Sequence, residues 1–318
     1  MITVAIRHQQ NPKRMQQRKN NVIKLQDTFG DLNSASDKHN REYNIQKLYK
    51  RFRSAAPFPK KAYYDGEIVD LLSKTFGLKG IQFGNWLTTE DRYNYSLALY
   101  SCLYDMNKVL NFKTKNLGLS QSLAVALGSR GVPNSLAHYE GDNFVINITR
   151  YKRKDRLLVP MPKEWRFINT GGSGSFGHEY GHFLDNAFGL WSDQHINGNW
   201  LTGDPHSMHK EPLTYNKRTN PIRAQLEVVF KLMLWEKDGN RSAFHKRITS
   251  QSDYYNRRCE MFARLFEVYL SIKLKQKGIY NSFLVKRKYV GNMYLTEKEM
   301  KPIIPEMDKL ISLLRARS

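Results

Sequence analysis

Apolar residues recur at helical spacing over long parts of this chain of 318 residues. The first such pattern predicts an amphipathic helix over residues 89–111, after a threonine-rich start. Its apolar positions, three or four residues apart, are Leu99, Leu103, Met106 and Leu110. Three further patterns of the same kind follow later, and their sequences are PIRAQLEVVFKLMLWEK, RRCEMFARLFEVYLSIKL and MKPIIPEMDKLISLL. We therefore expect a mainly helical C-terminal part.

A different pattern, NFVINIT, lies near the middle of the chain. One side of it carries Phe144, Ile146 and Ile148, and the other side carries Val145 and Asn147. This period of two predicts a strand that belongs to a sheet. A glycine-rich connection, NTGGSGSFG, later leads into a helical segment, GHEYGHFLDNAFG. Helices combined with a small sheet indicate the α+β class.

The N-terminal part differs from the rest in charge. Residues 1–62 contain 14 Lys and Arg but only 4 Asp and Glu, and they are rich in Gln and Asn. Such a segment cannot easily bury a core, so we expect a basic arm or linker over 1–62 and a globular domain over 63–318. Two interpretations of the arm stay open. It is either a solvated linker or an arm that binds nucleic acid, with bases stacked on Tyr43, Tyr49 and Phe52.

The whole chain is strongly basic, since 51 Lys and Arg against 29 Asp and Glu give a net charge of +22. This charge attracts nucleic acid, anionic membranes or acidic proteins, although basic proteins without such partners are also common. A hydrophobic content of 40 % excludes disorder throughout. The two cysteines, Cys102 and Cys259, lie in apolar helical patterns. We therefore expect buried free thiols and a reducing compartment.

The most specific motif lies in GSFGHEYGHFLDNAFG. His178 and His182 are four residues apart, so on a helix both imidazoles lie on one face and can hold one metal ion. Glu179 then points to the remaining coordination position, where it can accept a proton from metal-bound water and return it to a leaving amine. An apolar stripe on this segment supports the helix, and it consists of Phe176, Tyr180, Phe183, Leu184 and Ala187.

A catalytic zinc site has a third protein ligand and leaves the fourth position to water. In RRCEMFARLFEVYLSIKL one narrow polar line runs along an otherwise apolar helix, through Glu260, Arg264, Glu267 and Ser271. A polar line on a mostly buried helix meets other polar groups. We therefore predict Glu260 as the third ligand, with Arg264 and Glu267 as supporting charges. The alternative is that these three residues only form ion pairs along the helix.

Other residues near this motif carry weaker indications. Tyr254 precedes the Glu260 helix and is predicted to stabilise the oxyanion of an attacked carbonyl, with simple packing as the alternative. Asp185 lies one turn beyond His182, where it is either a partner of an imidazole or neighbouring group, or an exposed carboxylate. The remaining histidines lack ligand spacing, and His138 is interpreted as a structural histidine.

Four blocks of the sequence, in order, resemble the first large polyvalent protein-associated domain, which occurs in large proteins of phages and conjugative elements. The resemblance runs from about Gly80 to near the C-terminus. The blocks are IQFGNWLTTEDRYNYSLALYSCLYDM, LAVALGSRGVPNSLAHYEGDNFVINITR, GHEYGHFLDNAFG and CEMFARLFEVYL.

The last two blocks are also similar to anthrax lethal factor-type zinc metallopeptidases, whose third ligand is a glutamate in a similar helix. This similarity implies metal ligation by His178, His182 and Glu260, with Glu179 as general base. That family has its oxyanion tyrosine seven residues before the glutamate. This chain has an aspartate at that position, and Tyr254 lies one residue later.

The resemblance implies a zincin-like metallopeptidase core. Its expected parts are a small, mostly antiparallel sheet, the HEYGH helix beneath it and the Glu260 helix that crosses to complete the site. A peptide is expected to lie along an edge strand near Phe144 to Ile148, with β-type hydrogen bonds. This chain departs from the family in a basic excursion at 151–175 and in the stretch 189–252, and both are expected near the cleft.

The sequence therefore predicts a zinc-dependent metallopeptidase of a phage or another mobile genetic element. Zn²⁺ is the expected cofactor, metal-bound water the nucleophile, and a protein or peptide the substrate. The alternative is a nucleic-acid-associated or virion structural protein that uses a catalytically silent zincin scaffold, with nucleic acid bound by residues 1–62. No oligomeric state follows from the sequence.

The start of the sequence, MITVAIRHQQ, lacks the apolar core of a signal peptide, and no segment reaches the roughly 18 apolar residues of a membrane span. We therefore expect a protein without a membrane span, made in the cytoplasm of a bacterial host. Packaging into a virion or delivery elsewhere stays open.

Overall fold

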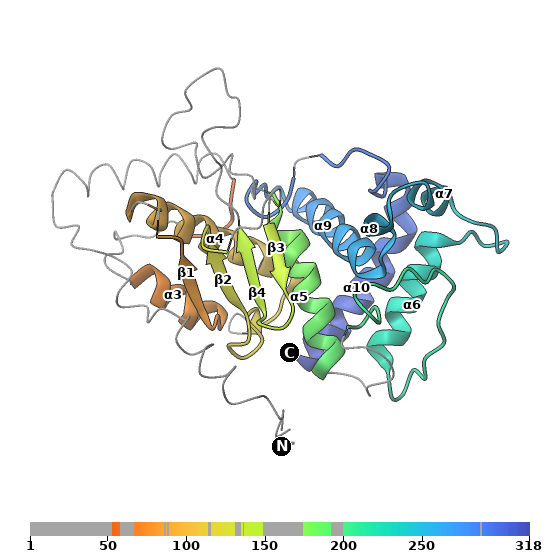
Figure 1. The fold of residues 1–318 in the computed structure, drawn as a ribbon, viewed down its shortest axis with the longest axis horizontal. Helices are drawn as coiled ribbons and strands as arrows, with labels where there is room; N and C mark the ends of the chain where they lie inside the picture. Colours follow the sequence, from red (N-terminus) through yellow and green to blue (C-terminus); the bar gives the residue numbers. More distant parts are fainter. Residues whose placement is uncertain are drawn as a thin grey trace.

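A small sheet and a group of helices lie side by side, with helices α5 (Phe176–Trp191) and α9 (Arg258–Gln276) between them (Figure 1). The predicted basic arm lies outside the described residues apart from 53–57, and so does most of the predicted excursion at 151–175. The computed structural model describes residues 53–57, 67–85, 87, 89–113, 116–130, 135, 137–148, 174–191, 200–286 and 288–318.

The sheet has four strands in the order β1-β2-β4-β3. Strand β1 is parallel to β2, and β2 is parallel to β4, whereas only β3 and β4 are antiparallel. The prediction of a mostly antiparallel sheet was therefore wrong, and the sheet is mixed. The strands are β1 (Gly80–Phe83), β2 (Ala124–Leu127), β3 (Ala137–Glu140) and β4 (Val145–Ile148).

The parallel pairing follows from the connection between β1 and β2. Helix α4 (Thr89–Leu110) lies between these strands in sequence and matches the helix predicted over 89–111. A helical crossover returns the chain to the end of the sheet from which it started, so the next strand runs in the same direction. The short turn between β3 and β4 instead makes a hairpin, which is antiparallel.

Strand β4 confirms the strand predicted in NFVINIT, but it lies inside the sheet. It pairs with β2 on one side and β3 on the other, and all four of its residues are buried. The prediction of a peptide along an edge strand at Phe144 to Ile148 was therefore wrong, because both backbone edges of β4 are already paired. Among the described strands, the neighbour of β4 that lies at the edge of the sheet is β3, the last in the order.

The helical patterns after the sheet are confirmed. They form α6 (Pro221–Leu234), α9 and α10 (Glu297–Arg317). Helix α10 begins with a capping box, in which Thr296 and Glu299 each bond to the other's backbone N–H. The other helices among the described residues are shorter, and they are α3 (Glu67–Phe76), α7 (Ala243–Thr249) and α8 (Asp253–Asn256).

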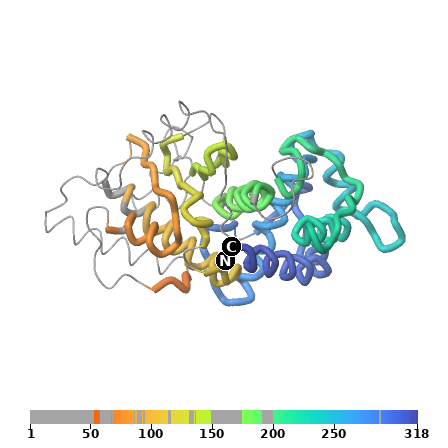
Figure 2. Tube along the Cα trace, turned by 90° about the horizontal axis from the view of Figure 1, so that it is seen from below, coloured from red at the N-terminus to blue at the C-terminus, as the bar shows by residue number. Residues whose placement is uncertain are grey.

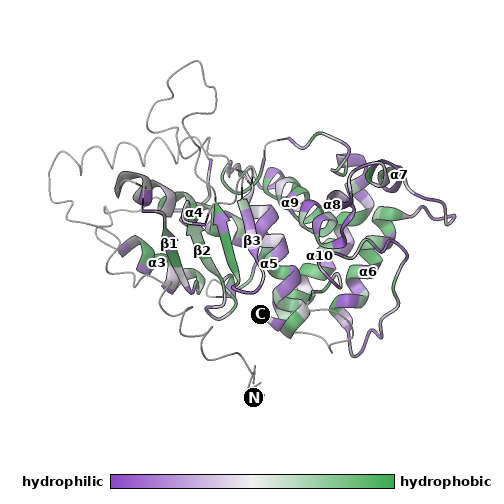
Figure 3. Ribbon diagram, in the orientation of Figure 1, coloured by the Kyte–Doolittle hydropathy of each residue, from purple (hydrophilic) through white to green (hydrophobic). Residues whose placement is uncertain are grey.

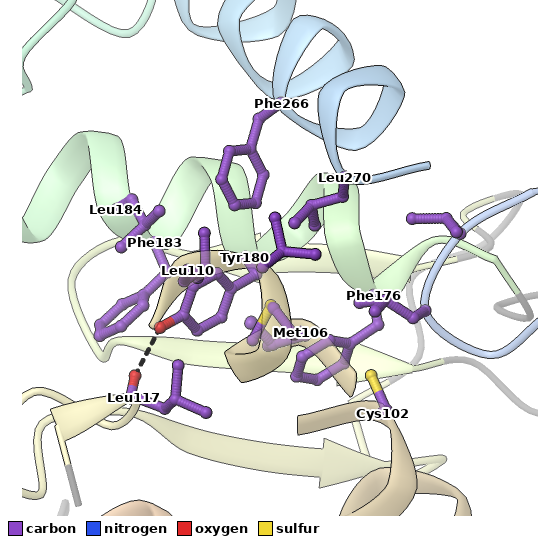
Figure 4. Close-up of a cluster of buried hydrophobic side chains, with 14 of the residues drawn as sticks. Cys102, Met106, Leu110, Leu117, Phe176, Tyr180, Phe183, Leu184, Phe266 and Leu270 are labelled. Atoms are coloured by element: carbon purple, nitrogen blue, oxygen red, sulfur yellow. Dashed lines mark hydrogen bonds between the residues drawn. The ribbon is translucent and has the colours of Figure 1, made fainter. Parts of the chain in front are cut away.

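The core is centred on α5, which lies between the sheet and α9 (Figure 2). The five apolar residues predicted as its stripe are all buried. Figure 4 shows how α4, α5 and α9 meet around Tyr180, whose hydroxyl donates to the carbonyl of Leu117 at 2.7 Å. Cys102 and Cys259 are buried free thiols, as predicted. Because the apolar stripe of α5 is packed into the core, the helix cannot rotate, and the direction of its two histidines is fixed.

Hydropathy follows this arrangement, because β2 and β4 are mainly hydrophobic and the helices carry hydrophilic residues on their outer parts (Figure 3). Within the described part of the chain, no helix has both the length and the apolar character that crossing a membrane requires.

Candidate metal centre

The two histidines of HEYGH lie one turn apart on α5. Their ring centroids are 4.9 Å apart, and the ring planes are nearly perpendicular, at 81°. His182 is 7 % exposed, and the His178 side chain is 14 % exposed. The i, i+4 spacing places both imidazoles on one face of the helix, as the motif predicted.

Glu260 from α9 lies opposite these two rings. Its Oε2 atom is 3.4 Å from His178 Nε2, and its Oε1 atom is 3.4 Å from His182 Nε2. One ligand atom from each of the three residues lies within 4.8 Å of the others. The structure thus brings together all three residues that the sequence predicted as metal ligands, although the histidines and the glutamate are far apart along the chain.

The spacing of these atoms fits a metal ion. A separation of 3.4 Å is longer than the roughly 2.7–3.2 Å of an ordinary N–H···O hydrogen bond. Two ligand atoms on a tetrahedral ion with bonds of about 2.1 Å lie about 3.4 Å from each other. Two imidazoles and one carboxylate are also a ligand set of catalytic zinc sites. The donor set and its spacing therefore fit a divalent metal.

A glycine inside the motif lets α9 come this close. A Cβ atom on Gly181 would lie 3.0 Å from Ala263 Cα and 3.3 Å from Phe266 Cδ1. Ala263 follows Glu260 by three residues on the same helix. Because Gly181 has no side chain, the two helix backbones approach closely enough for Glu260 to reach both histidines.

The second nitrogen of His178 also has a partner. Its Nδ1 atom is 3.3 Å from Glu267 Oε1, and the Glu267 side chain is 2 % exposed. A carboxylate on the non-ligating nitrogen orients the ring and makes the ligating nitrogen more basic. Glu267 therefore contacts a predicted ligand, as expected of a supporting charge on the polar line of α9.

Arg264 is the other supporting charge, and it contacts the predicted ligand directly. Its guanidinium bonds Glu260 Oε2 at 2.8 Å and the Glu260 carbonyl at 3.1 Å. An ion pair along the helix, as in the alternative interpretation, does exist here. It accounts for only part of the polar line, because Glu260 also faces two imidazoles and Glu267 pairs with His178.

The three central groups shift each other's pKa. Burial lowers the pKa of His178, but the neighbouring carboxylates of Glu260 and Glu267 outweigh it and raise the value to about 10. Burial raises the pKa of Glu260, whereas its two histidine partners hold it well below its usual range. The site therefore holds positive charge strongly, either as protons or as a metal ion that replaces them.

Glu179 lies between the two histidines in sequence and is 6 % exposed. Burial raises the pKa of its carboxyl group, and the neighbouring His178 and His182 lower it. The net shift is upward. A raised pKa brings a carboxylate closer to neutral pH, where a general base exchanges protons most effectively.

His182 has a different environment from His178. Within the described residues its buried Nδ1 atom has no hydrogen-bond partner, and its ring lies edge-to-face with Trp200 at 6.0 Å. Asp185 accepts hydrogen bonds from the backbone N–H and the hydroxyl of Thr202, at 2.9 and 2.7 Å. It therefore anchors the segment beside His182. The alternative of an exposed carboxylate was wrong, because Asp185 is fully buried.

Two buried arginines hold the same segment in place. Arg223 donates to the carbonyls of Trp200, Leu201 and Gly189, at 2.8, 3.0 and 3.2 Å. Arg258 donates to the carbonyl of Thr202 at 3.1 Å. Sequence analysis missed both arginines, although a charged residue inside an apolar helical pattern is a usable indication. They explain why the segment 200–202 is largely buried, with Leu201 and Thr202 shielded from solvent.

Tyr254, from α8, lies beside Glu260 but does not approach the histidines in any described contact, and its role at an oxyanion stays a prediction. Burial, followed by the charge of Glu260, raises the pKa of its phenol. The Arg264 guanidinium lies 5.6 Å from the Tyr254 ring centre and 4.7 Å from that of Tyr255. Tyr254 is 46 % exposed, so its ring reaches solvent at the rim of the site.

His138 lies on β3, an edge strand of the described sheet. Its Nε2 atom is 3.3 Å from Glu140 Oε1, and Arg130 pairs with the same carboxylate at 2.6 Å. Its Nδ1 atom is buried and has no hydrogen-bond partner among the described residues. The interpretation as a structural histidine therefore holds for one ring nitrogen and not for the other.

The C-terminal segment can be compared with known families. Residues 246–318 match the family model of large polyvalent protein-associated domain 1. The matched residues include α9 and α10, and thus Glu260, Arg264 and Glu267, whereas α5 with both histidines lies outside them. No curated protein and no solved structure matches the chain.

Proposed function

We propose that this protein is a zinc-dependent metallopeptidase of a phage or another mobile genetic element. The observation that carries the proposal is the distance of 3.4 Å from the Glu260 carboxylate to each imidazole Nε2 atom. This is the spacing of metal ligands, and it arises where the sequence also supplies the general base of the HExxH motif. The match to a domain of large polyvalent proteins supports the mobile-element setting.

Each residue of the centre has a role in this proposal. His178, His182 and Glu260 hold the zinc ion. When bound, zinc supplies Lewis-acid chemistry, which acidifies a water molecule and polarises the scissile carbonyl. Glu179 takes the proton from the attacking water and delivers it to the leaving amine. Its burial and raised pKa suit both halves of this transfer.

Three other residues assist. Glu267 and Arg264 orient His178 and Glu260 through the contacts given above. Tyr254, half-exposed at the rim, is proposed to donate its hydroxyl proton to the oxyanion of the attacked carbonyl. The peptide substrate would pair with β3, which lies at the edge of the sheet among the described strands and takes the place of the strand predicted for this purpose.

The first test is metal content by elemental analysis, with and without added zinc. The wild-type chain is expected to hold about one zinc ion, and the double variant His178→Ala, Glu260→Ala is expected to hold none. Absence of zinc from the wild-type chain, even after zinc is added, would refute the metal centre.

The second test addresses catalysis. Glu179→Gln removes the base but keeps the three ligands, so it should retain zinc and lose cleavage of a protein substrate by a factor of roughly 100 or more. A pooled peptide library, read by mass spectrometry, serves as the substrate. Equal turnover by wild type and variant would refute the role of Glu179.

The second function considered, a virion or nucleic-acid-associated protein on a silent scaffold, stays a prediction. It rests on the net charge of +22 and on the basic residues 1–62. In this case, retention on nucleic acid should weaken steeply with salt and should fall when residues 1–62 are removed. Absence of retention at low salt would refute it.

A further inference from the structure

The backbone of Trp200 lies directly on α5. Its carbonyl accepts from Arg223 at 2.8 Å, and the backbone N–H of the next residue, Leu201, donates to the carbonyl of Asp185 at 2.9 Å. A Cβ atom on Gly189 would lie 2.4 Å from Trp200 Cα, so the missing side chain of this glycine lets the two backbones come this close. The position from which the indole starts is therefore fixed relative to the helix that carries both histidines.

The indole of Trp200 contacts a predicted metal ligand and also β3. Its ring lies edge-to-face with His182, with centroids 6.0 Å apart and planes at 79°. It meets Tyr139 on β3 in the same way, at 5.9 Å and 82°. A Cβ atom on Gly141, the residue after β3, would lie 3.2 Å from Trp200 Cζ2, so the indole packs closely there as well. Trp200 thus joins His182 to β3 by direct packing.

The β3 side of this packing is itself tied to α5. The hydroxyl of Tyr139 donates to Asn186 Oδ1 at 3.0 Å, and the Tyr139 ring lies edge-to-face with Phe183 at 6.2 Å. Asn186 follows His182 on α5 by four residues, which is about one helical turn. The Trp200 ring therefore packs against a partner that is held in place, and it can restrain the His182 ring from the other contact.

The two histidines are oriented by different means. His178 Nδ1 has the carboxylate of Glu267 at 3.3 Å. The same nitrogen of His182 is buried and has no hydrogen-bond partner among the described residues. Rotation of either ring would move its Nε2 atom away from Glu260, and a partner on the second nitrogen prevents this rotation at His178. At His182 the edge-to-face contact with Trp200, an arrangement that aromatic rings prefer, restrains the ring instead.

We propose that Trp200 is a positioning residue of the metal centre, which orients His182 by packing where a hydrogen bond orients His178. Because the same indole packs on Tyr139, it also fixes the distance between His182 and β3. This inference rests on the proposed metal site but not on peptidase activity.

The test uses the full chain and two measurements. The first is zinc affinity, by competition with a chromophoric chelator. The second is the visible absorption spectrum at saturating Co²⁺, which depends on the number and arrangement of the metal's ligands and is not changed by a loss of stability in a folded protein. Urea unfolding shows whether each variant is folded.

The variants are Trp200→Leu, which removes the ring contacts, and Trp200→Phe, which keeps a smaller aromatic ring on the same backbone. Trp235→Leu is the matched control. Trp235 makes the same kind of contact with a histidine outside the metal centre, His245, at 5.0 Å and 85°.

We expect Trp200→Leu to bind zinc about 10-fold more weakly than the wild type and to change the Co²⁺ spectrum. Trp200→Phe should show a smaller loss, of about 3-fold, in the same direction. Trp235→Leu should match the wild type in both measurements.

Wild-type affinity and an unchanged Co²⁺ spectrum in folded Trp200→Leu overturn the inference alone. If Trp200→Leu does not fold, the same result in Trp200→Phe overturns it. An equal loss of affinity in Trp235→Leu, with unchanged spectra throughout, also overturns it, because the effect would then be a general loss of stability. A wild-type chain that binds no zinc overturns the metal site and the inference together.

Discussion

Replacing Gly181 by alanine tests whether close contact between α5 and α9 builds the site. Two effects oppose each other in this variant. Alanine favours a helix interior by about 1 kcal/mol over glycine, so at an open position the substitution would stabilise the protein. At Gly181 the new Cβ would lie 3.0 Å from Ala263 Cα, whereas carbon atoms in contact prefer roughly 3.5–4.0 Å.

The close contact should outweigh the helix preference. Ala263 Cα is backbone and cannot rotate away, so α9 must shift by about half an ångström or more. Overpacking of this kind costs about 1–3 kcal/mol. Glu260 lies one turn from Ala263 and would move with it, whereas metal sites tolerate only about 0.2 Å of displacement. We expect Gly181→Ala to lose both stability and zinc affinity, the latter by roughly 10-fold or more.

Urea unfolding of the metal-free chain and zinc competition measure the two consequences separately. The pair Ser312→Gly and Ser312→Ala, at an exposed position of α10, calibrates the helix preference within the same protein. Two results together would refute the argument from close contact. Gly181→Ala would be stabilised by as much as Ser312→Ala exceeds Ser312→Gly, and it would bind zinc like the wild type.

Three further predictions follow from individual groups. Burial raises the pKa of Asp185 to about 6, above an unfolded value near 3.9, so its contribution to stability is full below about pH 4 and is lost as pH rises through 6. Between pH 4 and pH 8 the free energy of unfolding of Asp185→Asn should therefore change by about 3 kcal/mol less than that of the wild type. Urea unfolding at the two pH values measures this, and an equal change in both proteins would contradict the prediction. Zinc removal should lower the melting temperature of the wild type, because a bound ligand stabilises the native state, whereas Glu260→Gln should respond far less. Tyr254→Phe should lower kcat of peptide cleavage by about 10- to 100-fold with little change in KM, and an unchanged kcat would leave Tyr254 only a packing role.

Helical periodicity made much of the site predictable. His178 and His182 are four residues apart, and Glu260 begins a polar line on an apolar helix, so their faces follow from the sequence alone. Such patterns depend only on the geometry of one helix. The same reasoning predicted Glu267 and Arg264 as supporting charges, and both contact the predicted ligands.

The sheet was predicted less well. The alternation in NFVINIT predicted β4 but not its neighbours, and strand order and direction follow from connections that no local pattern encodes. Thus β4 proved to be an inner strand, and β3 lies at the edge of the sheet among the described strands. Asp185 was similarly undecided, because its partner Thr202 comes from a segment without periodicity.

The sequence by itself determined which residues share a face of α5 and of α9, and which faces are apolar, because side-chain direction in a helix repeats every 3.6 residues. Only the tertiary structure decided that these two faces meet at a distance suited to a metal and that the gap at Gly181 permits it. Contacts of this kind join residues that are distant in the chain. They depend on how helices pack, and spacing along the sequence does not encode that packing.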